Sequence, residues 1–216
     1  MRPLSPLEAR VLGVLVEKQH TVPDTYPLSV NAITAGCNQK TARFPVIEAT
    51  DAEVMTAVDG LKGLSLVFEG SGSRVVKFEH NMGRVLGVPS QAVALLTVLM
   101  LRGPQTAAEL RLNCERLYKF ADISSVEGFL EELAAKEPAR VVKLARAPGS
   151  REARWAHLLC GEVAEASTAA LLEGGGGVSA GEIAALKAEQ TRLASEVDAL
   201  KALVHRLARE LGVDPA

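Results

Sequence analysis

Helix-start signals recur along this chain at a spacing that predicts the same small fold twice. A capping box places Ser or Thr before a helix and Glu three residues later, so that each side chain bonds a backbone N–H at the helix start. Five boxes precede segments with helical spacing of apolar residues, and they begin at Ser5, Thr50, Thr106, Ser124 and Ser179. Together they divide the chain into a regular series of short helices.

The segments between the boxes form one pattern that occurs twice. In the first copy we predict three helices and two strands, at about 5–19, 29–37, 51–63, 65–69 and 74–79. In the second copy the same elements are predicted at about 90–102, 106–116, 124–136, 140–145 and 151–159. Both hairpins end in an aromatic-x-His sequence, at His80 and His157. A repeated position of this kind indicates a packing or hydrogen-bonding role more often than a ligand.

Three helices followed by a two-stranded hairpin are typical of the winged-helix form of the helix-turn-helix, in which the hairpin is the wing. The predicted fold class is therefore α+β, mainly α, with two tandem winged-helix domains at 1–82 and 88–161. Three helices and a hairpin are also a simple way to form a small hydrophobic core, with no role in DNA binding. Winged-helix domains bind DNA and proteins alike, so the fold alone does not decide the function.

The C-terminal part predicts a linker and a coiled coil. Residues 162–178 are rich in Ala, Glu and Gly, and no GK[ST] follows the four glycines, which favours a flexible linker over a phosphate-binding loop. Residues 179–212 carry a heptad pattern with a and d positions at Ile183, Leu186, Gln190, Leu193, Val197, Leu200, Val204, Leu207 and Leu211. Leu at every d position and β-branched residues at most a positions favour a parallel two-stranded coil. We therefore expect a homodimer rather than a helix that folds back on its own domain.

Charge is distributed unevenly along the chain. Residues 81–161 carry 11 basic against 8 acidic residues, whereas residues 1–80 carry 8 against 9 and residues 162–216 carry 5 against 9. Only the second repeat should attract a polyanion such as duplex DNA. Eight basic residues from the two wings and from the connection at 38–50 are the candidate nucleic-acid-binding residues: Lys40, Arg43, Arg74, Lys77, Lys143, Arg146, Arg151 and Arg154.

The third helix of each repeat, which usually enters the DNA groove, is acidic instead. The first carries Asp51, Glu53 and Asp59 against Lys62, and the second carries Glu127, Glu131 and Glu132 against Lys136. Phosphates would repel such helices. The second wing, residues 140–154, has five basic residues against Glu152 alone. Phosphate contact by this wing and a solvated hairpin paired with the acidic helix both remain open.

The connection at 38–50 is predicted to be scaffold first. Phe44, Val46 and Ile47 should dock on the core, while Pro45 prevents the helix from continuing. Lys40 and Arg43 should project near the start of the third helix, where a secondary anion contact is conceivable.

Catalysis has little support in the sequence. The four histidines are scattered, and no metalloprotease helix, nucleophile elbow or paired-carboxylate motif occurs. Cys37, Cys114 and Cys160 show no CxxC spacing and are typical of buried thiols in a reducing cytosol. The longest apolar run, 92–101, is too short to span a bilayer, and no signal peptide is evident. We expect a cytoplasmic protein that is not an enzyme and has no cofactor, metal or membrane partner.

Four stretches carry a resemblance: LSPLEARVLGVLVEKQ, TYPLSVNAITAGCNQK, VLMLRGPQTAAELR and APGSREARWAHLLCGEV. Together they resemble the uncharacterised bacterial YceH-type proteins over essentially the whole chain. The resemblance implies tandem winged-helix domains, a cytoplasmic setting and no established activity or cofactor. This sequence departs from that family at Ala42, where the family has Asn, and at Phe44, where it has an acidic residue.

Two hypotheses for function follow from these observations. The first is a non-enzymatic dimer that resembles transcription regulators and contacts DNA through the basic second wing. The second is a protein-interaction adaptor, like the tandem winged-helix proteins of chromosome-organising complexes, and the acidic third helices favour it. The two differ in whether the partner is duplex DNA or another protein.

Overall fold

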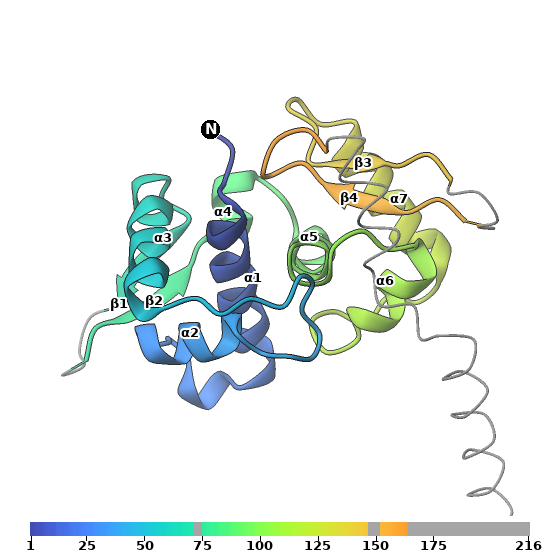
Figure 1. Ribbon diagram of the computed structural model, residues 1–216. Helices are drawn as coiled ribbons and strands as arrows, with labels where there is room; N and C mark the ends of the chain where they lie inside the picture. The colour runs from blue at the N-terminus through green and yellow to red at the C-terminus, as the bar shows by residue number, and fades with distance from the viewer. Residues whose placement is uncertain (71–74, 147–151, 164–216) are drawn as a thin grey trace, which may run out of the picture. The chain divides into compact units, whose positions relative to one another are not determined.

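The computed structural model describes residues 1–70, 75–146 and 152–163, and its fold is mainly helical with two small antiparallel sheets (Figure 1). The first half of the described chain contains α1 Pro6–Thr21, a 3-10 turn at Pro23–Thr25, α2 Val30–Cys37, α3 Asp51–Gly63, β1 Val67–Gly70 and β2 Lys77–His80. The second half contains α4 Met82–Leu86, α5 Ser90–Arg102, α6 Ala107–Asn113, α7 Ile123–Ala134, β3 Val141–Lys143 and β4 Trp155–His157. Apart from α4, which joins the halves, the predicted order of elements is present in both. The predicted coiled coil, and the predicted linker before it from residue 164 on, lie outside the described residues.

The two halves share their strand pairing as well as their order of elements. β1 pairs with β2 so that Val67 faces His80, and β3 pairs with β4 so that Val141 faces His157. In each half a residue from the segment between the first and second helix also bridges the second strand. Leu28 exchanges two backbone hydrogen bonds with Phe78, and Gln105 does the same with Trp155. The hairpin of each half is thereby fastened to the helices by the backbone.

Three of the predicted capping boxes are confirmed, and one is wrong. Ser5, Thr50 and Thr106 each cap a helix with a Glu three residues on, and both reciprocal bonds form. At the start of α7 the cap is Asp122, whose Oδ1 accepts from the backbone N–H of Ser125 at 2.7 Å. Because Asp122 captures this donor, the helix begins one residue earlier than predicted. The box predicted at Ser179 lies outside the described residues.

Strand β1 begins two residues later than predicted because α3 closes with an extra turn. Ser65 adopts φ +58°, in the left-handed region, and the backbone N–H of Leu66 donates to the carbonyl of Leu61 at 3.0 Å. This geometry is a common way to satisfy the last carbonyls of a helix. The chain becomes extended only after Leu66.

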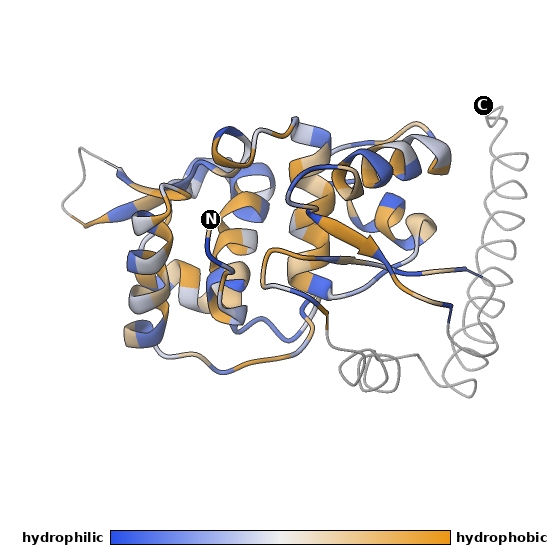
Figure 2. Cartoon of the chain, turned by 90° about the horizontal axis from the view of Figure 1, so that it is seen from above, coloured by the Kyte–Doolittle hydropathy of each residue, from blue (hydrophilic) through white to orange (hydrophobic). Residues whose placement is uncertain are grey.

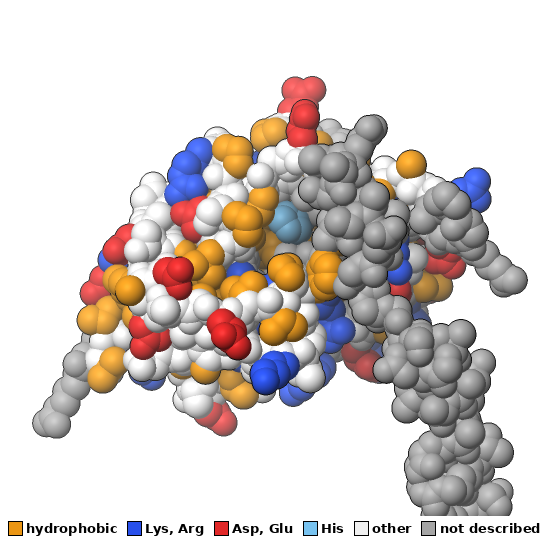
Figure 3. All heavy atoms as spheres, in the orientation of Figure 1, with side chains coloured by type: hydrophobic (Ala, Val, Ile, Leu, Met, Phe, Trp, Pro, Cys, Tyr) orange, Lys and Arg blue, Asp and Glu red, His pale blue; other side chains and the backbone are white. Residues whose placement is uncertain are grey.

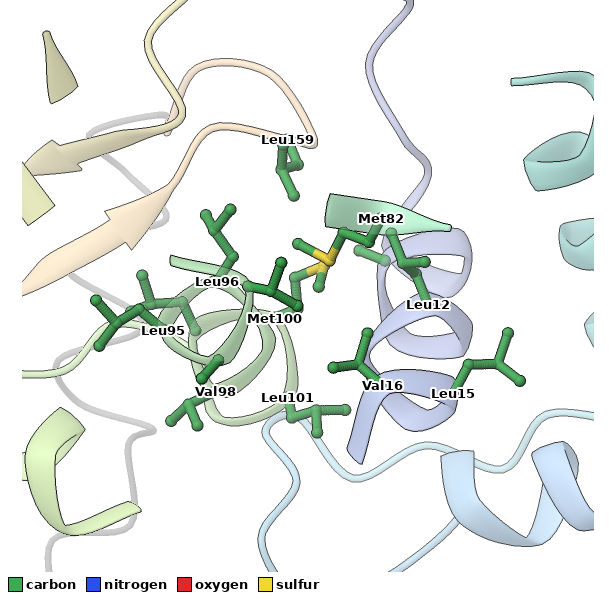
Figure 4. Packing of buried hydrophobic residues seen from close by; sticks show 14 of the residues in the cluster. Leu12, Leu15, Val16, Met82, Leu95, Leu96, Val98, Met100, Leu101 and Leu159 are labelled. Carbon is green, nitrogen blue, oxygen red and sulfur yellow. The ribbon is translucent and has the colours of Figure 1, made fainter. Parts of the chain in front are cut away.

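The described parts of both halves belong to one compact unit whose core lies between α1 and α5. Figure 4 shows Leu12 and Val16 of α1 beside Met100 and Leu101 of α5. α5 is hydrophobic over most of its length (Figure 2), and every residue from 92 to 101 is buried. Gly13 allows the close approach of the helices, since a Cβ added there would lie 2.9 Å from Leu101 Cδ2. The apolar run at 92–101 is thus part of a buried helix of the second half, which packs against α1 of the first half.

No helix within residues 1–70, 75–146 or 152–163 is long and apolar enough to cross a membrane.

His80 and His157 end the second strand of their halves, and both are held neutral. Burial lowers the pKa of each to about 4, and the nearby His20 adds to the effect at His80. The ring of His80 bonds Gln19 Oε1 at 2.7 Å and accepts from the backbone N–H of Met82 at 3.4 Å. The packing and hydrogen-bonding role predicted for this position fits His80.

We expect mild acid to destabilise the fold through these two histidines. A histidine in the unfolded chain has a pKa near 6.5, so the unfolded state takes up protons first as the pH falls, and stability is lost below that value. At pH 5 the loss is at most about 2 kcal/mol per histidine. Urea unfolding at pH 7 and pH 5 measures it, and His80→Asn/His157→Asn should show a smaller difference between the two pH values. Equal pH dependence in the variant and the parent would contradict this assignment.

Candidate functional site

The connection between α2 and α3, residues 38–50, is fixed by its own polar groups and by the second half of the chain. The side chain of Asn38 pairs with the backbone of Ala49 through two hydrogen bonds of 2.8 Å, which closes the loop. The backbone N–H of Phe44 donates to the carbonyl of Leu101 in α5 at 2.8 Å. Val46, predicted to dock on the core, is 54% exposed, so that expectation is wrong, whereas Ile47 packs against the core. The loop is a structural connection that joins the two halves.

Arg43 is buried in this loop, and the expectation that it projects toward solvent is wrong. Its guanidinium forms a bidentate pair with Glu17 of α1, with Nη2 2.6 Å and Nη1 3.1 Å from the carboxylate oxygens. Nε donates to the carbonyl of Gly36, and the remaining donors reach the carbonyl of Ala42 and Oε1 of Gln39. A guanidinium has five N–H donors, so all of them are used. Arg43 therefore has no donor left for a phosphate.

The pKa of the Glu17 carboxyl reflects its ion pair with Arg43. Burial alone would raise the pKa of the Glu17 carboxyl, but the hydrogen bonds and charge of Arg43, with help from Lys18, lower it on balance. Lys40, in the same loop, is exposed and remains a candidate for an anion contact.

The backbone at Ala42 explains why the YceH-type proteins, which this sequence resembles, have Asn at this position. Its φ is +58°, a conformation that Asn adopts more readily than Ala because its short polar side chain bonds locally. An Asn at this position therefore has a backbone reason and need not belong to a chemical site.

The outward faces of α3 and α7 are acidic, as the sequence indicated. On α3, Asp51, Glu53 and Asp59 are exposed, and Glu53 is committed to capping the helix at Thr50, which lowers the pKa of its carboxyl. On α7, Glu127, Glu131 and Glu132 are exposed. These faces would meet phosphate with like charge.

The second hairpin, formed by β3, β4 and the residues beyond them, carries the basic residues that remain available. Lys143 and Arg146 are exposed, and Lys143 Nζ lies 5.3 Å from the centre of the Trp155 ring. Both residues line a shallow hollow of about 410 Å³ together with Glu127 and Glu152. Basic groups are therefore exposed on this hairpin, but acidic groups share the hollow with them.

Arg154 points to a structural role instead. Its Nη1 donates to the carbonyl of Pro104 at 3.0 Å, and its Nη2 lies 3.4 Å from a carboxylate oxygen of Glu109 in α6. The pairing that the sequence allowed between this hairpin and an acidic helix is thus made with α6. Arg151 and Arg74, two other candidate residues, lie outside the described residues.

The first hairpin carries exposed apolar residues that the charge pattern did not indicate. Phe68 and Val76 are 44% and 49% exposed, and Lys77 beside them is partly buried. The only signal in the sequence was the adjacent pair Val75-Val76 next to a predicted turn. Exposed apolar residues on a hairpin are more typical of a protein contact than of a phosphate contact.

The three cysteines lie in the described part of the chain as free thiols. Cys37 and Cys114 are buried free thiols, and burial raises the pKa of each to about 12. The pKa of Cys160 is likewise raised, to about 11. No group of three or more His, Cys, Asp or Glu side chains that could hold a metal ion occurs among the described residues.

Comparison with known proteins places the chain among bacterial relatives of similar length. The family model described as "Protein of unknown function, DUF480" matches residues 4–150. The chain is 70% identical to a UPF0502 protein from Burkholderia multivorans and 69% identical to one from Burkholderia cenocepacia. In both cases the match covers 99% of this chain and 92% of the relative.

Proposed function

This chain belongs to the DUF480 family, and from that premise we propose that it is a non-enzymatic, cytoplasmic, dimeric tandem winged-helix protein that binds the DNA backbone through its second wing. The repeated order of three helices and a hairpin supports the winged-helix assignment. So does the backbone bridge that fastens each hairpin to the segment between the first two helices. With this assignment, β1–β2 and β3–β4 are the two wings, and α3 and α7 are the third helices.

The observation that carries the proposal is the contrast between the second wing and the third helices. Lys143 and Arg146 are exposed on the wing, whereas α3 and α7 present carboxylates. Lys and Arg on phosphates supply most of the affinity of nonspecific DNA binding, and they carry no sequence information. We therefore expect contact with the DNA backbone without groove reading, and little preference among DNA sequences.

Fluorescence anisotropy with a random duplex, titrated with salt, tests this proposal. The full chain should bind at about 50 mM salt and lose affinity steeply as salt rises, because binding releases counterions. Two unrelated duplex sequences should bind with similar affinity. Strong preference for one sequence would contradict backbone contact, and absence of binding at about 50 mM salt would rule out the DNA proposal.

A protein-interaction adaptor is the second candidate, and the first wing favours it. Phe68 and Val76 are exposed apolar residues of that wing, and the acidic face of α3 belongs to the same repeat. Exposed apolar residues rimmed by charge are typical of protein contact surfaces. This function takes the first place if the full chain binds no duplex.

Dimerisation through the heptad segment is a further part of the proposal. Val197 is an a position, so Val197→Asp places an unpaired charge in the expected seam and should convert the dimer into a monomer. Ser195→Asp, at a solvent-facing f position, is the matched control and should remain dimeric. Sedimentation equilibrium of the full chains measures the mass, and a parent with the mass of one chain would contradict the proposal.

A further inference from the structure

A large apolar cleft lies where the two halves meet. Its volume is about 870 Å³, within the range of small-molecule sites in proteins. Its walls come from the start of α1, the connection at 44–49, the end of α5 and the segment after β4. The apolar lining includes Leu7, Phe44, Ile47, Met100 and Val163. Figure 3 shows a face on which hydrophobic side chains lie beside a hollow that contains a histidine side chain.

Arg10 lines this cleft, and its charge is buried without a counter-ion. The residue is only 4% exposed, and its Nη1 and Nη2 donate to the carbonyls of Cys37 at 3.1 Å and Pro45 at 2.7 Å. Its Nε is buried and has no hydrogen-bond partner among the described residues. It forms no salt bridge with any described carboxylate, in contrast to Arg43, which pairs with Glu17.

A buried guanidinium without a counter-ion lowers the stability of the fold unless a bound group supplies the missing negative charge. Burial lowers the pKa of Arg10, and the positive charge of Arg43 nearby lowers it further. A buried charge is ordinarily paired and hydrogen-bonded, since carbonyl oxygens alone leave it uncompensated. A carboxylate that entered the cleft would supply the missing negative charge.

His157 adds a second polar group to the lining of the same cleft. Its Nδ1 is buried and has no hydrogen-bond partner within the described part of the chain. Its ring is neutral at pH 7, so it offers a donor or an acceptor but no charge. Among the described residues that line the cleft, Arg10 alone therefore carries a positive charge.

The acidic residues of the cleft limit which anions fit. Glu48, Glu53 and Glu162 also line it, and all three are exposed. They would repel a ligand that carries several negative charges, such as a nucleotide. The ligand that fits the cleft is therefore an apolar molecule that carries a single carboxylate.

We propose that this cleft is a binding site for a small amphipathic monocarboxylate, with the carboxylate on Arg10, a hydrogen bond to His157 and the apolar body against the cleft walls. Because the walls come from both halves of the chain, a bound ligand stabilises their packing against each other. The site shares β4 with the second wing through His157, but it includes none of the residues proposed to contact DNA, so it stands whether or not the protein binds DNA.

Isothermal titration of the full chain with decanoate tests the site, with 1-decanol and decylamine as probes of the same apolar length. Decanoate should bind saturably and raise the melting temperature, and it should bind more tightly than either other probe. Charge-assisted hydrogen bonds of this kind change affinity by about ten- to a hundredfold, so Arg10→Met should weaken decanoate binding by that factor and leave decanol binding unchanged. Arg84→Met, which alters an exposed arginine on α4, is the matched control.

A second variant keeps the test informative if Arg10→Met fails to fold. Met100→Trp leaves Arg10 in place but fills the cleft, and it should abolish binding of both decanoate and decanol. The proposal is overturned if the parent binds no decanoate up to about 1 mM. It is also overturned if decanoate binds no more tightly than decanol, or if a folded Arg10→Met or Met100→Trp binds decanoate like the parent.

Discussion

Arg43→Met is expected to lower the free energy of unfolding by about 3–5 kcal/mol, because it removes the bidentate partner of the half-buried Glu17 carboxylate and leaves it only the ion pair with Lys18. The Arg43 side chain has no exposed surface, and its five donors hold α1, the end of α2 and the connection at 38–50 together. Methionine fills a similar volume but donates no hydrogen bond. Loss of the carbonyl contact at Gly36 adds to the effect, since a buried acceptor is left unpaired.

Urea unfolding at pH 7 measures this prediction, and Lys40→Met is its control. Lys40 lies in the same loop but is exposed, so its replacement should change stability by no more than about 0.5 kcal/mol. The double variant Glu17→Gln/Arg43→Met should recover part of the loss, because it removes the stranded charge. A loss below about 1 kcal/mol for Arg43→Met would show that the pair contributes little.

The pair also has a defined pH dependence. The folded pKa of Glu17 is below its ordinary value, so the stability that it contributes is present above the unfolded pKa and is lost as the pH falls through the folded value. This loss occurs below the window in which His80 and His157 act.

Local signals in the sequence were sufficient for the helices and the repeat. Ser5, Thr50 and Thr106 act within four residues of themselves, and a pattern that depends on such short range can be read directly. The start of α7 was misplaced because Asp122 and Ser124 both qualify as caps, and only the folded backbone selects between them.

Contacts between residues that are far apart in the sequence could not be predicted from the local sequence pattern. Arg43 was assigned to solvent because its loop is polar and basic, and nothing nearby indicates that Glu17, 26 residues earlier, pairs with it. The cleft was missed for the same reason, since Arg10, Pro45 and His157 meet only when α1 packs on α5. The role of the connection at 38–50 therefore follows from its contacts, which join it to both halves of the chain.

The second large expected effect concerns the second wing. If the wing binds the DNA backbone, replacing Lys143, Arg146 and Arg151 together by Ala should remove three phosphate contacts. Each contact contributes about 0.9 to the slope of log affinity against log salt, so the slope should fall by about 2.7. The same relation gives roughly a tenfold loss of affinity per contact at about 50 mM salt, or about a thousandfold for the triple variant. Arg154 is left in place because it holds the carbonyl of Pro104 and its loss would disturb the fold.

A matched triple variant distinguishes local contact from the general effect of charge. Arg84, Arg116 and Lys119 are exposed basic residues outside the second wing, and replacing them by Ala removes the same charge from the same chain. Anisotropy of both variants with one random duplex, from about 50 to 200 mM salt, should show a large loss only for the wing variant. Similar losses in the two variants would mean that net charge, rather than the wing, attracts DNA. A wing variant that binds like the parent would exclude the second wing as the contact, because exposed Lys and Arg at the interface cannot be removed without loss of counterion release.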